Sequence, residues 1–165
     1  MNIENIGHRF TEIINTSEWG ELQNKYNKCN DIYVLGHGGN MGIADHTAVD
    51  MTRLSNGTKN AICPGSCVVA TSLINDTDFT QWMVAWLQQR TSTRTKGQMK
   101  RSLQWASDNG METCLLTAKP ISNKIKGLTQ VILGVDYYHT AECLSLLLQY
   151  QLTHGSGNEC PPIGQ

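Results

Sequence analysis

The sequence predicts an α/β protein: a three-layer α-β-α sandwich around a five-stranded parallel sheet, doubly wound. Three observations lead to this fold class. Five short apolar runs alternate with longer segments that have helical periodicity. The first run ends in a glycine-rich bend, Gly-His-Gly-Gly-Asn, and a helical pattern follows at once. No internal repeat divides the 165 residues, a length that suits one domain with a sizeable core.

Composition narrows the class of protein. Hydrophobic residues make up 39% of the chain and charged residues 16%, and the formal net charge is -1. There is no basic block for nucleic acid and no apolar run near the length of a membrane span. The N-terminus lacks the pattern of a signal peptide, so we expect a cytoplasmic protein. We expect one domain over residues 1–153, beginning with a helical segment at 1–30, and a disordered tail at 154–165.

The N-terminal third predicts helix, strand and helix in turn. Residues 9–28 read as one or two amphipathic helices, and residues 32–35 as a short buried strand. Residues 41–54 predict a helix with Asn40 as its N-cap. Its apolar residues stand at helical spacing: Met41, Ala44, Ala48 and Met51.

The middle of the chain continues the alternation. Residues 60–63 predict the second strand, and residues 67–74 a short apolar helix. The uninterrupted run Trp-Met-Val-Ala-Trp-Leu at 82–87 predicts a third, fully buried strand. Residues 98–109 form an amphipathic pattern that ends at Gly110, a residue favoured just after a helix.

Two further strands and a helix complete the pattern. Residues 113–117 and 131–135 predict strands four and five. Residues 138–152 predict a strongly apolar final helix, which is typical of a helix covered on more than one side. Strands separated by helices pair in parallel, and ligands of such sheets bind at the carboxyl ends of the strands.

Cysteine usage favours a reducing compartment. Four of the six cysteines lie in or beside apolar runs, which predicts small buried thiols: Cys63, Cys67, Cys114 and Cys143. The spacing of Cys63 and Cys67 can fit zinc. However, no second Cys/His pair stands at matching spacing, so the sequence does not favour a zinc finger.

Two loops carry the residues expected to bind an anion. Gly38, Gly39 and Asn40 follow the first strand and open a helix, where backbone N–H groups and the helix dipole attract phosphate. After the third predicted strand, four hydroxyls and two cations stand in the run Thr-Ser-Thr-Arg-Thr-Lys. A polar turn with an N-cap threonine is the alternative. The phosphate ligands expected from this loop are Thr91, Ser92, Thr93 and Thr95.

Titratable side chains point to acid–base or metal chemistry. His46 and Asp50 lie four residues apart on one helix face and can hold a metal ion, act as a proton-transfer pair or form a surface pair. His139 opens the last helix, and we expect it to converge with them. Asp76 lies in a short polar segment, residues 75–79. This segment either forms an Asx turn or lines the cleft where we expect His46, Asp50 and His139. Gln149 is a pocket residue or an interface residue.

In this order the motifs resemble the sugar isomerase (SIS) domain, most closely the phosphoheptose isomerases. The similarity covers residues 31–152. Residues 36–40 resemble the family's Gly-Asn-Gly-Gly-Ser loop, and 45–51 its Gln-His-Phe-Ala-x-Glu-Leu helix. Residues 75–79 match Asn-Asp-x-Gly-Phe, and 91–96 stand where the family has its phosphate loop, Ser-Thr-Ser-Gly-Asn-Ser.

The resemblance implies a flavodoxin-like fold and an activity. It implies aldose–ketose isomerisation of sedoheptulose 7-phosphate through an enediol, with the polar loops holding phosphate. Asp50 would be the base, and His46 with His139 the acid or the ligands of a metal ion such as zinc. Asp76 and Asn40 would line the substrate site. The relatives assemble as dimers or tetramers, so we expect a homo-oligomer.

The departures from the family leave the activity open. Asp50 replaces the family's glutamate, and Gln149 stands at the position of its catalytic histidine when the last helix is aligned on Glu142. Arg94 replaces a glycine of the phosphate loop, and the chain is shorter than the family after Phe79. The sequence therefore fits an isomerase or a non-catalytic phosphosugar-binding module. A flavodoxin-like domain with another ligand, or with a purely interacting role, is the third alternative.

Overall fold

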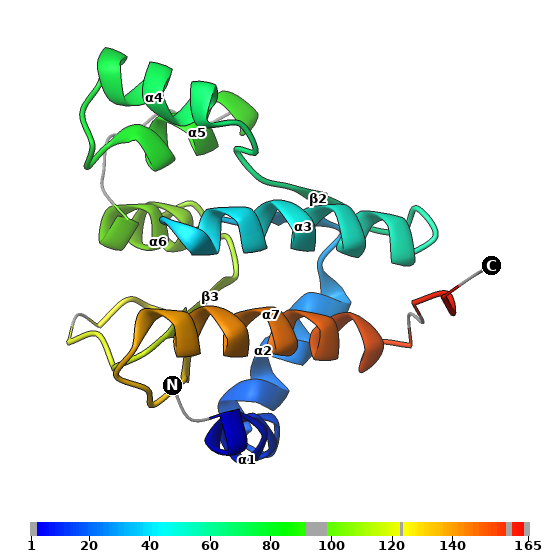
Figure 1. The fold of residues 1–165 in the computed structure, drawn as a ribbon. Coiled ribbons are helices and arrows are strands. Elements are labelled where there is room, and N and C mark those ends of the chain that lie inside the picture. Colours follow the sequence, from blue (N-terminus) through cyan, green and yellow to red (C-terminus); the bar gives the residue numbers. More distant parts are fainter. Residues whose placement is uncertain (1–2, 92–98, 123, 158–159, 164–165) are drawn as a thin grey trace. The chain divides into compact units, whose positions relative to one another are not determined.

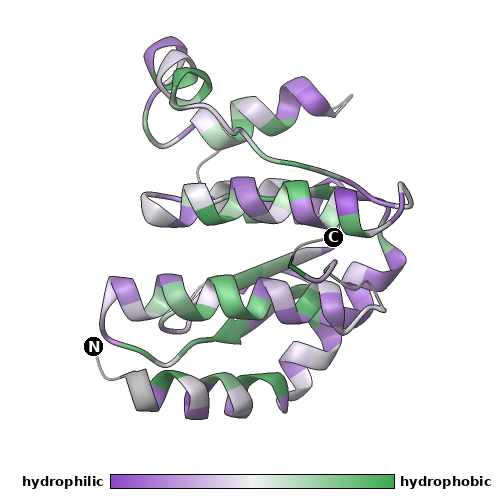
Figure 2. Cartoon of the chain, turned by 45° about the vertical axis from the view of Figure 1, so that its right-hand side comes forward, coloured by the Kyte–Doolittle hydropathy of each residue, from purple (hydrophilic) through white to green (hydrophobic). Residues whose placement is uncertain are grey.

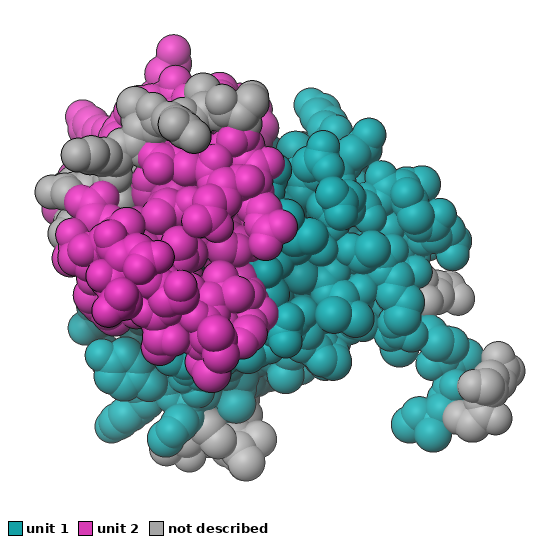
Figure 3. Space-filling view, turned by 90° about the horizontal axis from the view of Figure 1, so that it is seen from above, with its two compact units in different colours: residues 1–63, 116–120, 130–165 teal, residues 64–115, 121–129 magenta. Residues whose placement is uncertain are grey.

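A computed structural model describes residues 3–91, 99–122, 124–157 and 160–163 (Figure 1). The chain divides into two compact units, which Figure 3 colours separately. Unit 1 comprises Met1–Cys63, Leu116–Pro120 and Gln130–Gln165; unit 2 comprises Pro64–Leu115 and Ile121–Thr129. No helix of the described segments is long and apolar enough to cross a membrane.

Unit 1 contains a β-α-β crossover. Its elements are α1 (Ile3–Ile14), α2 (Ser17–Lys28), β1 (Asp31–Tyr33), α3 (Gly39–Leu54), β2 (Asn60–Ile62) and α7 (Tyr138–His154). β1 and β2 pair in parallel with Ile32 opposite Ala61, and α3 connects them. In this crossover the glycine bend connects the end of β1 to the start of α3.

Helix α7 packs with two other helices in the core of unit 1. α7 packs against both α3 and α1, and α3 and α7 lie side by side (Figure 1). Figure 2 shows hydrophobic and hydrophilic residues mixed along α1, whose Ile6 and Ile13 are buried. Leu144 and Leu148 of α7 are fully buried, which is why the last helix is so apolar.

A buried lysine just before β2 connects that strand to the end of α2 through hydrogen bonds. The Nζ of Lys59 donates to the carbonyl oxygens of Tyr26 at 2.7 Å and Cys29 at 2.9 Å. The ammonium also lies 4.4 Å from the centre of the Tyr26 ring. Burial lowers the pKa of Lys59. A cation at this position satisfies carbonyls at the end of α2 that have no partner in the helix.

Unit 2 is helical. It contains α4 (Cys67–Asp76), α5 (Trp82–Arg90) and α6 (Met99–Asp108), and α5 packs against both neighbours. Ser66 is the N-cap of α4 and accepts from the backbone N–H of Val68. The unit's core is rich in large side chains of α5 and α6, including Trp82, Trp86 and Trp105.

A second two-stranded parallel sheet joins β3 (Thr113–Thr117) to β4 (Leu128–Ile132). Its pairing continues past the strand ends, where the N–H of Leu133 donates to the carbonyl of Thr117 at 2.8 Å. Residues 113–115 and 128–129 belong to unit 2, and the rest of each strand belongs to unit 1.

The predicted five-stranded parallel sandwich is wrong. The described residues form two separate two-stranded sheets instead. The decisive error is at 82–87, the predicted central strand, which lies within the helix α5. A short apolar run has the same pattern in a buried strand and in a helix buried all round, and five residues of α5 are buried. Losing this strand removes the middle of the predicted sheet.

The other elements differ mainly in their bounds. The predicted strand at 113–117 coincides with β3, whereas the strand predicted at 131–135 lies at Leu128–Ile132. The segment predicted at 9–28 is two helices, separated where Thr16 caps α2 by accepting from the N–H of Trp19. α7 runs on to His154, one residue into the predicted tail.

Candidate functional site

The glycine bend between β1 and α3 depends on close backbone approach. Gly38, the N-cap of α3, has φ +56° and ψ -131°, a conformation that essentially only glycine adopts. A Cβ on Gly36 would lie 2.5 Å from the carbonyl carbon of Asn40 and even closer to its oxygen. The predicted strand, bend and helix are therefore present, but the N-cap is Gly38 and not the predicted Asn40, which is the second residue of α3.

A carboxylate of the chain itself lies at this bend. A Cβ on Gly39 would lie 2.6 Å from Cδ and 2.8 Å from Oε2 of Glu142, so any larger residue there would force the end of that side chain to move. Glu142 belongs to the first turns of α7, and Gly39 is the first residue of α3. A negative charge is favourable at a helix start because of the exposed N–H groups and the helix dipole. Glu142 thus occupies a position where we expected an external anion.

His46 and Asp50 form a polar cluster between α3 and α7. The Nε2 of His46 lies 3.1 Å from Oδ2 of Asp50 and 3.1 Å from the hydroxyl of Tyr150. The other carboxylate oxygen of Asp50 accepts from Nη2 of Arg53 at 2.9 Å. The His46 side chain is 56% exposed and that of Asp50 only 11%, so the histidine is the accessible member.

The geometry selects one tautomer of His46. The ionised carboxylate of Asp50 can only accept hydrogen bonds, so the Nε2 that faces it must carry a proton. The Tyr150 hydroxyl then shares that N–H as a second acceptor. In neutral His46 the remaining nitrogen, Nδ1, keeps its lone pair. The cluster therefore presents Nδ1 as a base.

Asp50 itself is closed to ligands. The small hollow beside it is bounded by Thr47, Gln149, Tyr150 and Thr153 and is too narrow to hold a water molecule. Both oxygens of Asp50 are engaged, by His46 and by Arg53. The sequence assigned the base to Asp50, but in this arrangement Asp50 orients the accessible His46.

His139 does not join this cluster. It is the second residue of α7 and is exposed, and Tyr150, which contacts His46, lies about 16 Å further along the helix at 1.5 Å per residue. Among the described residues no three His, Cys, Asp or Glu side chains come together as metal ligands. The donor set does not fit the predicted zinc ion, because the guanidinium of Arg53 already neutralises Asp50.

The remaining predicted residues lie in unit 2 or outside the described segments. Asp76 is the last residue of α4, is exposed and accepts from the side-chain amide of Asn75 at 3.2 Å. Thr91 is the C-cap of α5, and its hydroxyl donates to the carbonyl of Leu87 at 3.0 Å. The threonine loop therefore starts after a helix, not after a strand. Three predicted phosphate ligands fall outside the described residues: Ser92, Thr93 and Thr95.

The six cysteines form no disulfide with one another, and the prediction that four are buried is wrong. Cys67 and Cys143 are exposed, and Cys63 and Cys114 are half-buried. The thiol of Cys63 donates to Oδ1 of Asp45 at 3.1 Å. This contact gives the thiol a polar partner at the end of β2, so Cys63 is not simply a small apolar side chain.

Three residues of the site were not predicted as site residues from the sequence. Arg53 could have been, because it lies three residues after Asp50 and shares its helix face. Tyr150 and Glu142 come from α7, and only the packing of α7 beside α3 brings them to His46 and Gly39. No pattern along the chain marks those contacts.

Comparison with protein-family models, curated proteins and solved structures finds no match to this chain. The resemblance to phosphoheptose isomerases therefore stays a prediction.

Proposed function

We propose that the chain isomerises a phosphorylated sugar of the sedoheptulose 7-phosphate kind, with His46 as the proton-transfer group. The observation that carries this proposal is the His46–Asp50–Tyr150 cluster, which combines an accessible imidazole with a buried carboxylate that fixes its tautomer. An aldose–ketose isomerisation needs one group that removes a proton next to the carbonyl and returns it to the neighbouring carbon of the enediol. An imidazole suits both steps near neutral pH.

The residues of the cluster have separable roles in this proposal. Nδ1 of His46 takes the proton, and Asp50 stabilises the imidazolium that forms because its carboxylate lies 3.1 Å from the opposite nitrogen. Arg53 holds Asp50 in place through its 2.9 Å hydrogen bond. Tyr150 holds the ring from the side of α7. The predicted homo-oligomer would add residues from a second copy.

Phosphate binding at the glycine bend is the second part of the proposal. The N–H groups at the start of α3 favour an anion, and Glu142 lies there. A phosphate that reaches Gly39 must therefore displace or repel that carboxylate. The Glu142 side chain then limits the affinity of the chain for phosphate, and this can be tested by removing its charge.

A non-catalytic phosphosugar-binding module is the second candidate. It is favoured by Gln149, which lines the hollow beside Asp50 on α7 and cannot act as a general acid or base. In that case the cluster around His46 would only join α3 to α7.

A turnover assay with sedoheptulose 7-phosphate separates the two candidates. We expect the full chain to form the aldose product and His46→Gln to lose at least about a hundredfold in kcat, the contribution typical of a general base. His154→Gln, an exposed histidine at the end of α7, is the matched control and should keep full activity. Thermal protection by the sugar phosphate without turnover would support the binding module. If the sugar phosphate gives neither turnover nor thermal protection, both candidate functions are refuted.

The phosphate part is tested with Glu142→Gln. Removing the negative charge should strengthen binding of inorganic phosphate about threefold to tenfold, measured by isothermal titration. Glu18→Gln is the control, because Glu18 is an acidic residue in the first turn of another helix, α2. Equal phosphate binding by Glu142→Gln and the parent chain would contradict the role of Glu142.

A further inference from the structure

The turn between α3 and β2 contains an asparagine followed by a glycine. Asn56 and Gly57 are both exposed and have φ +50° and +79°. Positive φ at two successive residues is typical of the tight turns that Asn-Gly forms. The N–H of Thr58 closes the turn by donating to the carbonyl oxygen of Ser55 at 3.1 Å. This turn belongs to unit 1 and contributes no residue to the His46 cluster.

The side chain of Asn56 and the backbone nitrogen of Gly57 are both available to react. In the part of the chain that the structure describes, the Asn56 side chain takes part in no hydrogen bond, and the N–H of Gly57 has no acceptor. A Cβ on Gly57 would have no atom within 4 Å, so the space beside this peptide is open. The Gly57 nitrogen can therefore approach the side-chain carbonyl carbon of Asn56 without breaking a contact of either group.

A second Asn-Gly pair, at the end of α6, provides a contrast. The side-chain amide of Asn109 donates to the carbonyl oxygen of Trp105 at 2.7 Å. The N–H of Gly110 donates to the carbonyl oxygen of Ser107 at 3.1 Å. Asn109 is also half-buried, whereas Asn56 is exposed. Both groups that would have to react are thus held by hydrogen bonds at the second pair.

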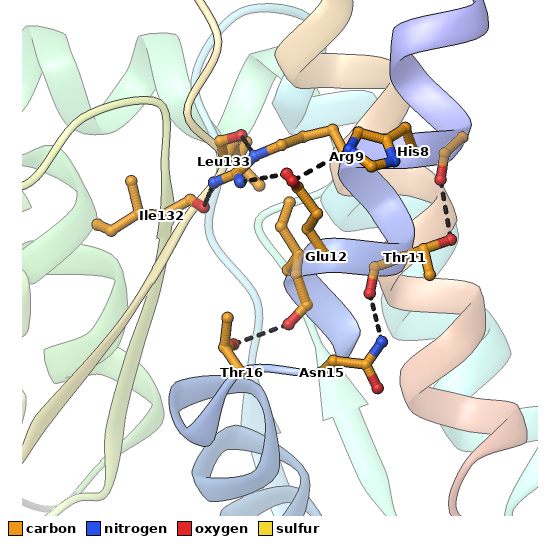
Figure 4. Close-up of polar contacts among 10 residues, drawn as sticks. His8, Arg9, Thr11, Glu12, Asn15, Thr16, Ile132 and Leu133 are labelled. Atoms are coloured by element: carbon orange, nitrogen blue, oxygen red, sulfur yellow. Dashed lines mark hydrogen bonds and ion pairs between the residues drawn. The ribbon is translucent and has the colours of Figure 1, made fainter.

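Other exposed asparagines of unit 1 are held in a similar way. The side-chain amide of Asn15 donates to the carbonyl oxygen of Thr11 at 2.8 Å (Figure 4). That of Asn60 donates to Oδ1 of Asp31 at 3.1 Å. Each of these asparagines is followed by a residue with a side chain, which hinders attack by the next backbone nitrogen. Exposure alone therefore does not make an asparagine of this chain reactive.

We propose that Asn56 is a site of spontaneous deamidation in the folded protein and that Asn109 is protected. The backbone nitrogen of Gly57 attacks the side-chain carbonyl carbon of Asn56 and loses its proton. The bond from that carbon to Nδ2 breaks, ammonia leaves and a cyclic succinimide forms. Water then opens the ring at either carbonyl, giving aspartate or isoaspartate. The net reaction consumes one water and releases one ammonia.

The isoaspartate product acts on the connection between α3 and β2. Its main chain runs through the former side-chain carbonyl and is longer by one CH₂. The turn is held by the Thr58 hydroxyl, which donates to the carbonyl oxygen of Ser55 at 2.8 Å, and by Oγ of Ser55, which accepts from the N–H of Lys59 at 3.1 Å. A longer turn disturbs these bonds and moves Lys59, which joins β2 to the end of α2. We therefore expect the modified chain to be less stable.

The test compares the two Asn-Gly pairs within one sample. The folded full chain is incubated at mildly alkaline pH, and mass spectrometry of its tryptic peptides follows the exchange of the amide NH₂ for OH at each site. We expect Asn56 to react at least about fivefold faster than Asn109, because two hydrogen bonds must open before Asn109 can react. Equal rates, or a faster reaction at Asn109, would overturn the proposal.

The same chain unfolded in guanidinium chloride is the control. Both asparagines are followed by glycine, so their rates should become similar once the contacts of the folded chain are lost. A ratio of the two rates that unfolding leaves unchanged would show that neighbouring residues in the sequence set the difference. That result would refute protection of Asn109 by its hydrogen bonds.

Variants test the effect on stability. Asn56→Gly removes the reacting side chain and suits the positive φ, so its melting temperature should stay constant during incubation. The parent chain should lose melting temperature in proportion to the isoaspartate formed, and Asn56→Asp, which has the other product's side chain, should melt close to the fresh parent chain. An unchanged melting temperature after conversion to isoaspartate would refute the effect on Lys59. His46→Gln should deamidate at the parent rate, so this test is independent of the proposed isomerase.

Discussion

Two glycines of one helix should respond to alanine in opposite directions. Gly38 is the N-cap of α3 with φ +56° and ψ -131°, and Gly42 lies inside the same helix. A Cβ would have no atom within 4 Å at either position, so neither substitution creates a clash. The difference between them is then purely one of backbone conformation, which makes the pair a test of the glycine bend.

The magnitudes follow from the two conformations. Forcing alanine into the Gly38 conformation costs about 1–3 kcal/mol. The lower entropy of the unfolded alanine chain returns about 0.4–1 kcal/mol, so Gly38→Ala should destabilise by about 1–2 kcal/mol. Gly42→Ala should stabilise by about 0.5–1 kcal/mol, because alanine is the better helix former. For a chain of this size each kcal/mol shifts Tm by about 2–4 °C.

Thermal unfolding followed by far-ultraviolet circular dichroism measures both effects, with urea unfolding as a check. Gly38→Ala should melt below the parent chain and Gly42→Ala above it. Equal melting temperatures for Gly38→Ala and the parent chain would refute the left-handed N-cap. A rise in both variants would show that the helix begins before residue 38.

Three further outcomes are expected. Lys59→Met should destabilise the chain by about 1–3 kcal/mol in urea unfolding, because two carbonyls lose a charged donor. The pKa of Glu12 is lowered, chiefly by the hydrogen bond from Arg9, so its contribution to stability is present above pH 4.5 and is lost as pH falls through the lowered value. In Glu12→Gln the melting temperature should fall less as the pH is lowered than it does in the parent chain. The same dependence of melting temperature on pH in both would contradict the pairing of Glu12 with Arg9. Asp50→Asn should move the proton of His46 from Nε2 towards Nδ1 in ¹⁵N spectra, with the other histidines unchanged as internal controls.

Local patterns predicted the parts of the fold that local interactions determine. The glycine bend and α3 follow from residues within one turn of each other, and β3 was placed at its observed bounds. The segment at 82–87 was misread because burial on all sides removes the periodicity that separates helix from strand. The count of strands and the sheet order depended on that one segment.

The candidate site was predicted in part for the same reason. His46 and Asp50 share a helix face, and their spacing alone brings them together. Their roles could not be read from spacing, because Arg53 and Tyr150 decide which group is engaged and which is accessible. Glu142 reaches Gly39 only through the packing of two helices about a hundred residues apart in the chain.

The position of α7, which follows α1 and α3 by many residues, has a consequence for synthesis in the cell. α1 and α3 leave the ribosome well before the fully buried Leu144 and Leu148 that pack with them. Unit 1 therefore cannot complete its core until α7 has emerged. A premature stop before residue 138 would leave its nascent helices with exposed apolar surface, an obvious target for chaperones and proteases.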